Sequence, residues 1–341
     1  MLDRHKLKTV LIGFGRVAAG YSKDVLLAKW FQYSTHAQVL AVHPDYDWAA
    51  VVETNDCLRK SAACNWGIQE VESSVCKLKD AASFEVAVIA TPPQSRSCFL
   101  DELPSLKAVI VEKPLALNVQ QAERFLKTCA ERKILVQLNL PRRTDVVMRE
   151  MAQSLTEKIG VPQAVFGTYG NGLMNNGTHM IDCLRMFLGK IIWVQAVNDG
   201  MQILEGPIDA DLSFPFLLGL SNKICAMFQP LTFEHFRENS LDIWGSKGRL
   251  ALVQEGLLAC LYSRNEHRYF EHSYELSNDM GDYRLTDQGC SLYSLYDNLS
   301  RSLHQNETLQ SDGSNGLKNM KVVDALKHSL SCGGSRIFVD G

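Results

Sequence analysis

The chain has 341 residues, roughly the length of two ordinary domains. Hydrophobic residues make up 46% and charged residues 21%, a balance typical of a globular protein with a sizeable core. With 35 lysines and arginines against 38 aspartates and glutamates, the formal charge is −3, which excludes a strongly basic nucleic-acid binder.

The apolar stretches are short and bordered by polar residues, and none approaches the roughly 18–20 residues that a membrane-spanning helix needs. The charged start of the chain is followed by Thr9-Val10-Leu11-Ile12, which is too short for the core of a signal peptide. The 10 cysteines are scattered, without a CxxC pair and without a histidine cluster at zinc spacing. We therefore expect reduced thiols, no bound metal, no membrane attachment and a cytoplasmic location.

The first third of the chain alternates β-branched runs with helical patterns. One helix is expected over Val119–Arg132, where Ala122, Phe125 and Cys129 recur at helical spacing. Alternation of strands and helices predicts a parallel sheet covered on both faces, hence the α/β class. Strands are expected over Thr9–Ile12, Trp48–Glu53, Val86–Ala90, Ala108–Val111 and Ile134–Leu138.

The pattern changes after Pro141, where strand-like runs begin to dominate. Helices are expected over Asp145–Lys158 and around His179–Leu188, and a final helix over about 317–331 follows a polar loop at Gln310–Asn315. The sequence thus predicts a second domain over residues 139–341, of α+β type with a mostly antiparallel sheet. Its strands are expected over Gln163–Tyr169, Ile191–Asn198, Ala210–Leu217, Lys223–Pro230, Ser240–Gly245 and Arg249–Val253.

The first strand runs directly into a GxGxxA motif, which is typical of dinucleotide-binding turns. Gly13 would make the tight turn, Gly15 would let the backbone approach a pyrophosphate, and Ala18 would allow close packing of helix on strand. The phosphates would lie over the N-terminus of the following helix, so Arg16 and Val17 join the predicted cofactor site. The alternative is a glycine-rich turn without a ligand.

A second strand ends in Glu53, whose carboxylate would accept hydrogen bonds from a ribose diol and repel a 2′-phosphate. It therefore favours NAD, with NADP kept as a possibility. The 35 residues from Ala18 to Glu53 exceed the usual interval of about 20, so Tyr21–Ser34 is interpreted as an insertion. The alternative for Glu53 is a solvated glutamate at the end of a strand.

Two further turns follow strands at their carboxyl ends, the side on which open α/β sheets bind ligands. Thr91, Pro92 and Pro93 come after one strand, and Glu112-Lys113-Pro114 comes after the next. All of them except Pro114 are assigned to cofactor binding. A lysine in that place would lie beside a nicotinamide, whereas the alternative is an unremarkable surface turn.

These motifs occur in one order with Gly177–Asp182 and with LDIWGSKGRL at Leu241–Leu250. In that order the sequence resembles the Gfo/Idh/MocA family, the relatives of glucose–fructose oxidoreductase and inositol dehydrogenase, over nearly the whole chain. The resemblance implies a Rossmann domain over residues 1–138, then a substrate-binding and oligomerisation domain with an open sheet. It also implies NAD or NADP as cofactor and a homodimer or homotetramer, because an open sheet face must be covered.

By the same resemblance, Lys113 and His179 are the catalytic residues. Oxidation of a hydroxyl group removes a hydride, which NAD accepts, and a proton, which a histidine of near-neutral pKa can accept. Lysine can polarise the oxygen or act as the base. Asp182 lies three residues after His179 on the same helix face and would support the site or contact the substrate.

One position departs from the family pattern. Many members carry an aspartate four residues before the histidine, whereas this chain has Asn175, which cannot ionise. Asn175 would bind substrate hydroxyl groups or orient His179. The alternative, given equal weight, is that Asn175 and Asn176 cap the helix together with Thr178.

Other candidates rest on single residues. Arg142, or its neighbour Arg143, could bind a substrate carboxylate or phosphate, and could equally be a solvated linker charge. Tyr169 begins a turn that would line the substrate site or be a simple turn. For His36 a structural role is favoured.

The leading hypothesis is an NAD(P)-dependent oxidoreductase that acts on a CH–OH group of a sugar, a cyclitol or a nucleotide-sugar. The Asn175 pattern favours sugars of surface polysaccharide biosynthesis, by resemblance alone. Two alternatives stay open: an epimerase or glycoside-cleaving enzyme that recycles bound NAD, and a non-catalytic regulator that senses the dinucleotide. The joint presence of Lys113 and His179 argues against the regulator.

Overall fold

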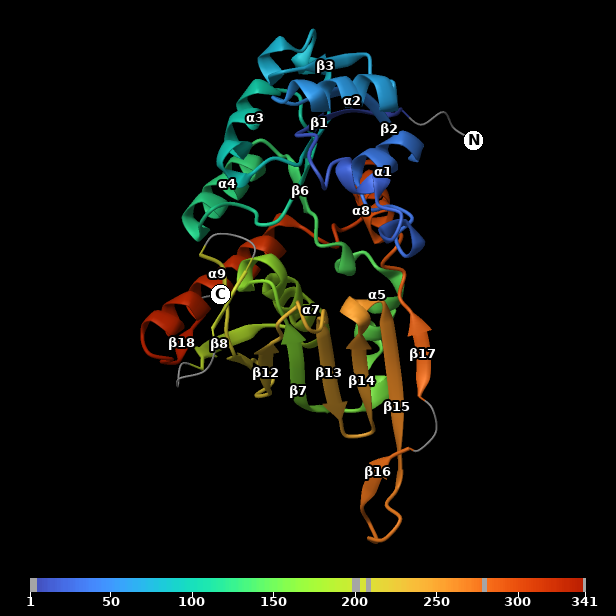
Figure 1. The fold of residues 1–341 in the computed structure, drawn as a ribbon, viewed down its shortest axis with the longest axis vertical. Helices are drawn as coiled ribbons and strands as arrows, with labels where there is room; N and C mark the ends of the chain where they lie inside the picture. The colour runs from blue at the N-terminus through green and yellow to red at the C-terminus, as the bar shows by residue number, and fades with distance from the viewer. Residues whose placement is uncertain (1–4, 198–202, 207–209, 278–280, 340–341) are drawn as a thin grey trace. The chain divides into compact units, whose positions relative to one another are not determined.

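The chain forms two compact units in the computed structural model, which describes residues 5–197, 203–206, 210–277 and 281–339. The first unit comprises residues 1–144 and 288–317, and the second comprises residues 145–287 and 318–341 (Figure 1). The sequence predicted a single boundary after residue 138 and placed all later residues in the second domain. Residues 288–317 instead return to the first unit, because Leu292, Leu295, Tyr296 and Leu299 are buried in its core.

A six-stranded parallel sheet in the order β3-β2-β1-β4-β5-β6 forms the centre of the first unit. Strands β4 and β5 are apolar and buried along their whole length, as expected of strands covered on both faces. Because β1, β4 and β5 are neighbours, the loops that follow them meet at the same edge of the sheet. The strands are β1 (Leu7–Ile12), β2 (Tyr46–Val52), β3 (Glu70–Glu72), β4 (Val86–Ile89), β5 (Ala108–Val111) and β6 (Leu135–Leu138).

Helices with ordinary caps cover this sheet. Asn118 accepts a hydrogen bond from the N–H of Gln121 at the start of α4, whose buried face is Ala122, Phe125 and Cys129, as predicted. Helix α8 was not predicted, and the three-residue strand β3 was also missed. The helices of the unit are α1 (His36–Val42), α2 (Asp56–Trp66), α3 (Arg96–Glu102), α4 (Val119–Glu131) and α8 (Ser291–Gln305).

The glycine motif leads into one helical turn rather than a long helix. The N–H of Ala19 donates to the carbonyl of Gly15 at 3.0 Å, and the chain then leaves through two short 3₁₀ turns, Gly20–Lys23 and Leu27–Lys29. Helix α1 continues the interrupted turn, because the N–H of Ala37 donates to the carbonyl of Ala18 at 2.8 Å. The predicted insertion at Tyr21–Ser34 is therefore an excursion out of a single helix.

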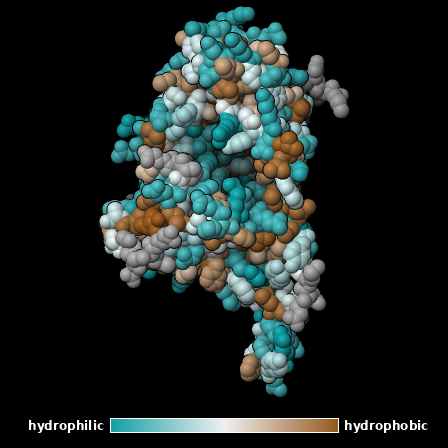
Figure 2. All heavy atoms as spheres, viewed as in Figure 1, coloured by the Kyte–Doolittle hydropathy of each residue, from teal (hydrophilic) through white to brown (hydrophobic). Residues whose placement is uncertain are grey.

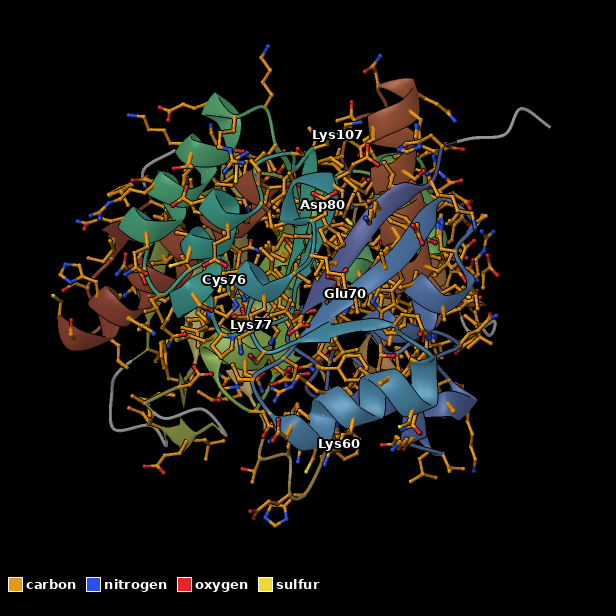
Figure 3. All side chains as sticks on the ribbon, turned by 90° about the horizontal axis from the view of Figure 1, so that it is seen from above. Lys60, Glu70, Cys76, Lys77, Asp80 and Lys107 are labelled. Carbon is orange, nitrogen blue, oxygen red and sulfur yellow. The ribbon has the colours of Figure 1, made fainter. Side chains whose placement is uncertain are left out.

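Charged side chains cover the outer surface of the first unit, as Figure 3 shows for Lys60, Lys77, Asp80 and Lys107. Lys107 precedes β5 and lies 2.6 Å from a carboxylate oxygen of Glu85, which precedes β4. This ion pair marks the amino edge of the sheet, so it lies at the opposite edge from the glycine motif.

The second unit is built on a mixed sheet in the order β16-β15-β14-β13-β7-β12-β11-β8-β18, with β17 on β15. The pair β12–β7 is parallel and the other pairs of this sheet are antiparallel. The strands are β7 (Pro162–Tyr169), β8 (Ile191–Ala196), β11 (Phe216–Leu220), β12 (Cys225–Pro230), β13 (Ser240–Gly245), β14 (Gly248–Val253), β15 (Leu258–Glu266), β16 (Tyr274–Leu276), β17 (Asp282–Leu285) and β18 (Ile337–Phe338), and a separate pair is β9 (Leu204–Glu205) with β10 (Leu212–Ser213).

Three predicted elements of this unit differ from the structure. The helix expected over Asp145–Lys158 is two helices that meet at Ser154, and the strand expected over Ala210–Leu217 is divided between β10 and β11 at Pro215. The loop expected over Gln310–Asn315 already contains the start of the last helix. Asn198, the last residue of another predicted strand, lies outside the described residues. The helices are α5 (Val146–Gln153), α6 (Leu155–Ile159), α7 (Thr178–Leu188) and α9 (Gly313–Ser331).

One face of the sheet is covered by helices and the other carries exposed apolar side chains. The core joins inward-facing strand residues to the buried sides of α5, α6, α7 and α9. On the outer face, Phe166 and Met227 are register neighbours and are 49% and 43% exposed, and Leu217 lies opposite Met227 on the next strand. Figure 2 shows that the hairpin of β15 and β16 is, by contrast, mostly hydrophilic.

We expect Phe228→Ala to lower the free energy of unfolding by about 3–5 kcal/mol, because a buried aromatic ring leaves a cavity. The ring of Phe228 stacks on Phe216 at a centroid distance of 5.0 Å and occupies the space beside Gly167. Urea unfolding measures the change. Met227→Ala, one residue away on the exposed face, is the control, and equal losses in the two variants would contradict this account of the core.

Candidate functional site

The glycine motif lies at the carboxyl edge of the parallel sheet with an open backbone face. Gly13 has a φ of +86°, and a Cβ there would come within 2.9 Å of the Thr91 side chain, so only glycine fits. A Cβ on Gly15 would meet no atom within 4 Å. The side chains of Arg16 and Val17 are exposed beside it. The loop thus packs tightly on the sheet at Gly13 and leaves open space at Gly15, where a ligand could approach the protein backbone.

Glu53 is held against this loop. One of its carboxylate oxygens accepts a hydrogen bond from the N–H of Phe14 at 2.6 Å, and the other accepts from the N–H of Asn55 at 2.8 Å. The second of these oxygens also accepts from the hydroxyl of Thr54 at 3.3 Å, whereas the oxygen bound by Phe14 has a further lone pair that can accept from a hydroxyl group. This arrangement differs from a solvated glutamate at a strand end, the alternative that the sequence left open.

Arg96 ties together the two turns that follow β4 and β5. Its side chain is 2% exposed, and it donates to the carbonyl of Thr91 at 3.1 Å, to that of Leu115 at 3.0 Å, and also to that of Pro114. Burial lowers the pKa of Arg96 to about 10, and the nearby charge of Glu112 opposes that shift. Sequence reasoning missed Arg96, because an arginine in the first turn of a helix carries no signal of its own.

Glu112 is the centre of a second set of buried contacts. It accepts from Nε2 of His36 at 2.8 Å and from the side-chain amide of Asn139 at 2.5 Å. Nδ1 of His36 lies 2.7 Å from the hydroxyl of Tyr296 on α8, in agreement with the structural role expected of this histidine. Burial alone would raise the pKa of Glu112, but the hydrogen bonds and the charge of Lys113 bring it below its ordinary value.

Lys113 is the second residue after β5 and is half-buried. Its flanks are both fixed: Glu112 is bound by His36 and Asn139, and the carbonyl of Pro114 is bound by Arg96. The peptide bond between Lys113 and Pro114 is cis. The first unit therefore brings the predicted cofactor residues and Lys113 to one edge of its sheet, with Pro92 and Pro93 in the adjacent turn.

In the second unit, a π-helical turn over Leu173–Gly177 precedes α7 and carries Asn175. The N–H of Gly177 donates to the carbonyl of Gly172 at 3.1 Å, which is the i to i+5 bond of such a turn. His179 is one turn further along and is half-buried. Asn175, His179 and Asp182 thus lie along one continuous helical segment.

The alternative that Asn175, Asn176 and Thr178 cap this helix does not agree with the structure, because the N-cap positions of the two helical segments are Gly172 and Gly177, which have no side chain. The carboxylate of Asp211 instead accepts from the N–H groups of Met174 and Asn175, at 2.8 and 2.9 Å. A cap that comes from 36 residues along the chain leaves no local sequence pattern.

Two predicted substrate contacts are buried in the second unit. Asp182 accepts from the side-chain amide of Asn319 on α9 at 2.9 Å, so of its two expected roles the structure favours support. Tyr169 is 0% exposed, and its hydroxyl donates to the carbonyl of Phe214 at 2.6 Å and accepts from its N–H at 2.9 Å. Burial raises the pKa of Tyr169. Tyr169 is therefore a core residue, and its assignment to substrate binding is corrected.

Arg142 lies in the short turn Pro141–Arg143, the last turn of the first unit before the chain enters the second, and it is half-buried. Among the described residues, no three histidine, cysteine or acidic side chains come together as metal ligands. No helix in the described ranges is long and apolar enough to cross a membrane.

A parallel sheet with a glycine-rich turn after its first strand is the architecture of a dinucleotide-binding Rossmann domain, and in this chain it is joined to a mixed-sheet unit. The family comparison gives the same class: the model of the Gfo/Idh/MocA oxidoreductase family, NAD-binding Rossmann fold, matches residues 7–140. The model of the family's C-terminal alpha/beta domain matches residues 167–336. The chain belongs to this family.

Solved structures share the fold across the whole chain. The WlbA dehydrogenase from Bordetella pertussis, in complex with NADH and UDP-GlcNAcA, is 20% identical with a TM-score of 0.73, over 99% of this chain and 100% of that chain. An oxidoreductase from Agrobacterium radiobacter in complex with NAD+, L-tartaric acid and magnesium is 19% identical with a TM-score of 0.73, over 98% of both chains.

A super-repressor mutant of Gal80p from Saccharomyces cerevisiae also shares the fold, with 15% identity and a TM-score of 0.73 over 98% of both chains. No curated protein matches the chain by sequence. At these identities the structural likeness extends to the fold alone.

Glu112→Gln should make the stability of the protein less sensitive to acid. Since the folded-state pKa of Glu112 lies below its ordinary value of 4.5, the ionised carboxylate stabilises the fold above that value. This contribution is lost as the pH falls through the lower, folded-state pKa.

Urea unfolding at a series of pH values from about 6 to about 3 measures the slope. The exposed Glu102→Gln is the matched control. The same slope in wild type and Glu112→Gln would show that the buried contacts of this carboxylate do not favour its ionised form.

Proposed function

We propose that the protein is an NAD-dependent oxidoreductase that transfers a hydride between the cofactor and the CH–OH or keto carbon of a sugar, cyclitol or nucleotide-sugar. The observation that carries this proposal is the fixed setting of Lys113 at the carboxyl edge of the Rossmann sheet. A surface lysine without function has no need of buried partners on both sides, whereas a lysine that must meet a reacting atom does.

The residues present fit a dinucleotide. The open face of Gly15, with the exposed Arg16 and Val17, would hold the pyrophosphate, and Glu53 would accept from the ribose hydroxyl groups. A carboxylate in that place disfavours the 2′-phosphate of NADP. When bound, NAD accepts or gives the hydride. The turns at Thr91 and Lys113 would flank its nicotinamide end.

The chain's own residues would move the proton. The Lys113 ammonium would donate a hydrogen bond to the substrate oxygen and stabilise its developing negative charge. His179 would take the proton in oxidation and return it in reduction. Asn175, which cannot ionise, would bind a substrate hydroxyl, and Asp182 would hold the helix through Asn319.

The substrate class is the finer part of the proposal. Asn175 and the half-buried Arg142 suit a polyhydroxylated substrate with a carboxylate or phosphate group. The WlbA dehydrogenase, which shares the fold, was crystallised with UDP-GlcNAcA. We therefore favour a nucleotide-sugar, as used in surface polysaccharide biosynthesis.

Two other functions are kept as candidates. An enzyme that recycles bound NAD, such as an epimerase or a glycoside-cleaving enzyme, would use the same residues and leave no NADH behind. The other candidate is a regulator that senses the dinucleotide, and a super-repressor mutant of Gal80p shares the fold of this chain. Lys113 and His179 together argue against the regulator.

The proposal includes a homo-oligomeric assembly and a cytoplasmic location. The apolar row of Phe166, Met227 and Leu217 on the open sheet face suits pairing with a second copy, as a homodimer or within a homotetramer. The described cysteines form no disulfide, which suits the reducing cytoplasm.

NAD(H) should stabilise the protein more than NADP(H) in a thermal-shift titration, because binding to the folded state raises its stability by mass action. Gly15→Val should weaken NADH binding by about tenfold or more, since a side chain there enters the open face. The variant should unfold like wild type in the absence of cofactor, unlike Gly13→Ala, where the added Cβ meets Thr91.

The same titration includes a panel of sugars and nucleotide-sugars, with nicotinamide absorbance as the readout. NADH formed on one class names the substrate. Binding without net NADH, together with epimerised or cleaved product, indicates the recycling enzyme, and binding without any product indicates the regulator.

Lys113→Ala should lower kcat by about 10²–10⁴-fold, the usual contribution of a positioned acid or base, and leave NADH binding measurable. Lys107→Ala is the matched control, because Lys107 is an exposed lysine at the opposite edge of the same sheet. Steady-state kinetics and NADH fluorescence measure the two quantities. Turnover retained in Lys113→Ala would remove this lysine from the mechanism.

A further inference from the structure

A single carboxylate holds the start of the helical segment that bears Asn175 and His179. Asp211 is 1% exposed, and its two oxygens accept separately from the consecutive N–H groups of Met174 and Asn175, at 2.8 and 2.9 Å. Charge-assisted hydrogen bonds of this kind are stronger than neutral ones, and a negative charge at a helix N-terminus is favoured by the helix dipole.

The backbone around Asp211 is shaped to admit this carboxylate. Gly172 has a φ of +91°, and a Cβ there would lie 2.0 Å from an oxygen of Asp211. A Cβ on Gly206 would lie 2.6 Å from the carbonyl oxygen of Asp211, and the N–H of Gly206 donates to that carbonyl at 2.7 Å. Two glycines thus allow the segment of Asp211 and the turn at residue 172 to approach more closely than side chains would permit.

The segment that carries Asp211 is itself anchored. Ser213 accepts from the N–H of Gly172 at 2.8 Å, and Phe214 is bound through both of its backbone groups by the hydroxyl of Tyr169 at the end of β7. Tyr169 is therefore a core residue that connects β7 to the segment holding the helix. The chain of contacts runs from β7 through residues 211–214 to the π-helical turn.

Asn175, in this turn, and His179, in α7, are four residues apart. Asn175 and His179 therefore lie on one face of the helical segment, and a shift or rotation of its first turn would move both of them. A wider π-helical turn without a firm attachment would be free to relax toward an ordinary α-helix, which would rotate Asn175 relative to His179.

We propose that Asp211 is a positioning residue of the active site: through the N–H groups of Met174 and Asn175 it fixes where Asn175 and His179 meet the substrate. This inference rests on the proposed function. Asp211 itself reaches only backbone groups in the contacts described, so it acts through the helix and takes no part in proton transfer.

Two substitutions and a control test the inference. Asp211→Asn keeps one acceptor oxygen and the shape, whereas Asp211→Ala removes both acceptors. Asp145→Asn is the matched control, because Asp145 is a buried aspartate of the same unit that accepts from the N–H of Met148 and caps α5.

We expect kcat to fall about tenfold in Asp211→Asn and about 100-fold in Asp211→Ala, since small misplacements of reacting groups cost rates of that size. NADH affinity should not change, because the first unit builds the cofactor site. Amide hydrogen exchange at residues 174–179 should accelerate in both variants, most in Asp211→Ala. The control should keep kcat.

The outcomes separate the inference from the proposed function. Faster exchange with an unchanged kcat would overturn positioning, as would an equal loss of kcat in Asp145→Asn. Unchanged exchange in Asp211→Ala would show that the carboxylate does not hold the helix. A wild-type protein that turns over no substrate would overturn the proposed function, and the exchange data would still decide whether Asp211 holds the segment.

Discussion

A buried guanidinium that bridges two backbone turns is the constraint on which the proposed cofactor edge depends. Parallel strands end at a common edge, but nothing in a sheet determines the path of the loops that leave it. Arg96 links the turn after β4 to the turn after β5 through their carbonyl groups, and those contacts and the nearby Glu112 offset part of the cost of burying its charge. Lys113 stands between Glu112, whose charge is near Arg96, and Pro114, whose carbonyl Arg96 binds.

In the second unit, a buried side chain of opposite charge likewise fixes a backbone segment. Where the first unit uses a cation on carbonyl groups, the second uses the Asp211 carboxylate on N–H groups. In both cases the charged side chain is buried, touches backbone, and lies beside a residue proposed to meet substrate. Ionic groups in such places are costly when left unpaired, so their loss disturbs the local backbone more than the loss of an apolar contact would.

Periodicity and turn chemistry predicted most of the fold. The strands at Ala108–Val111 and Ser240–Gly245 have the predicted bounds, because apolar alternation and flanking turns are local signals. Helix α8 was missed, since its burial depends on a return to the first unit that no neighbouring residue indicates. The strand expected over Ala210–Leu217 is divided at Pro215, because a proline has no N–H to donate to a neighbouring strand.

The site was predictable only where a motif is contiguous. Gly13, Glu53, Lys113 and His179 stand in recognisable local patterns, whereas Arg96 and Asp211 bind backbone groups 19 and 37 positions away. Tyr169 was misassigned because a tyrosine beside a glycine-rich turn has the same sequence appearance whether its hydroxyl faces solvent or a buried carbonyl.

The excursion at residues 20–34 leaves and re-enters one helix, and this geometry has an evolutionary consequence. Its ends are already brought together by the bond from Ala37 to Ala18, which lowers the entropy cost of closing the loop. Its last residues are held at the start of α8, where the N–H of Tyr33 donates to the carbonyl of Gly289 at 3.1 Å. The part before these contacts can change in length or composition without altering the glycine turn. The exposed Val25 and Leu26 lie on the part of the first unit that is freest to diverge among relatives.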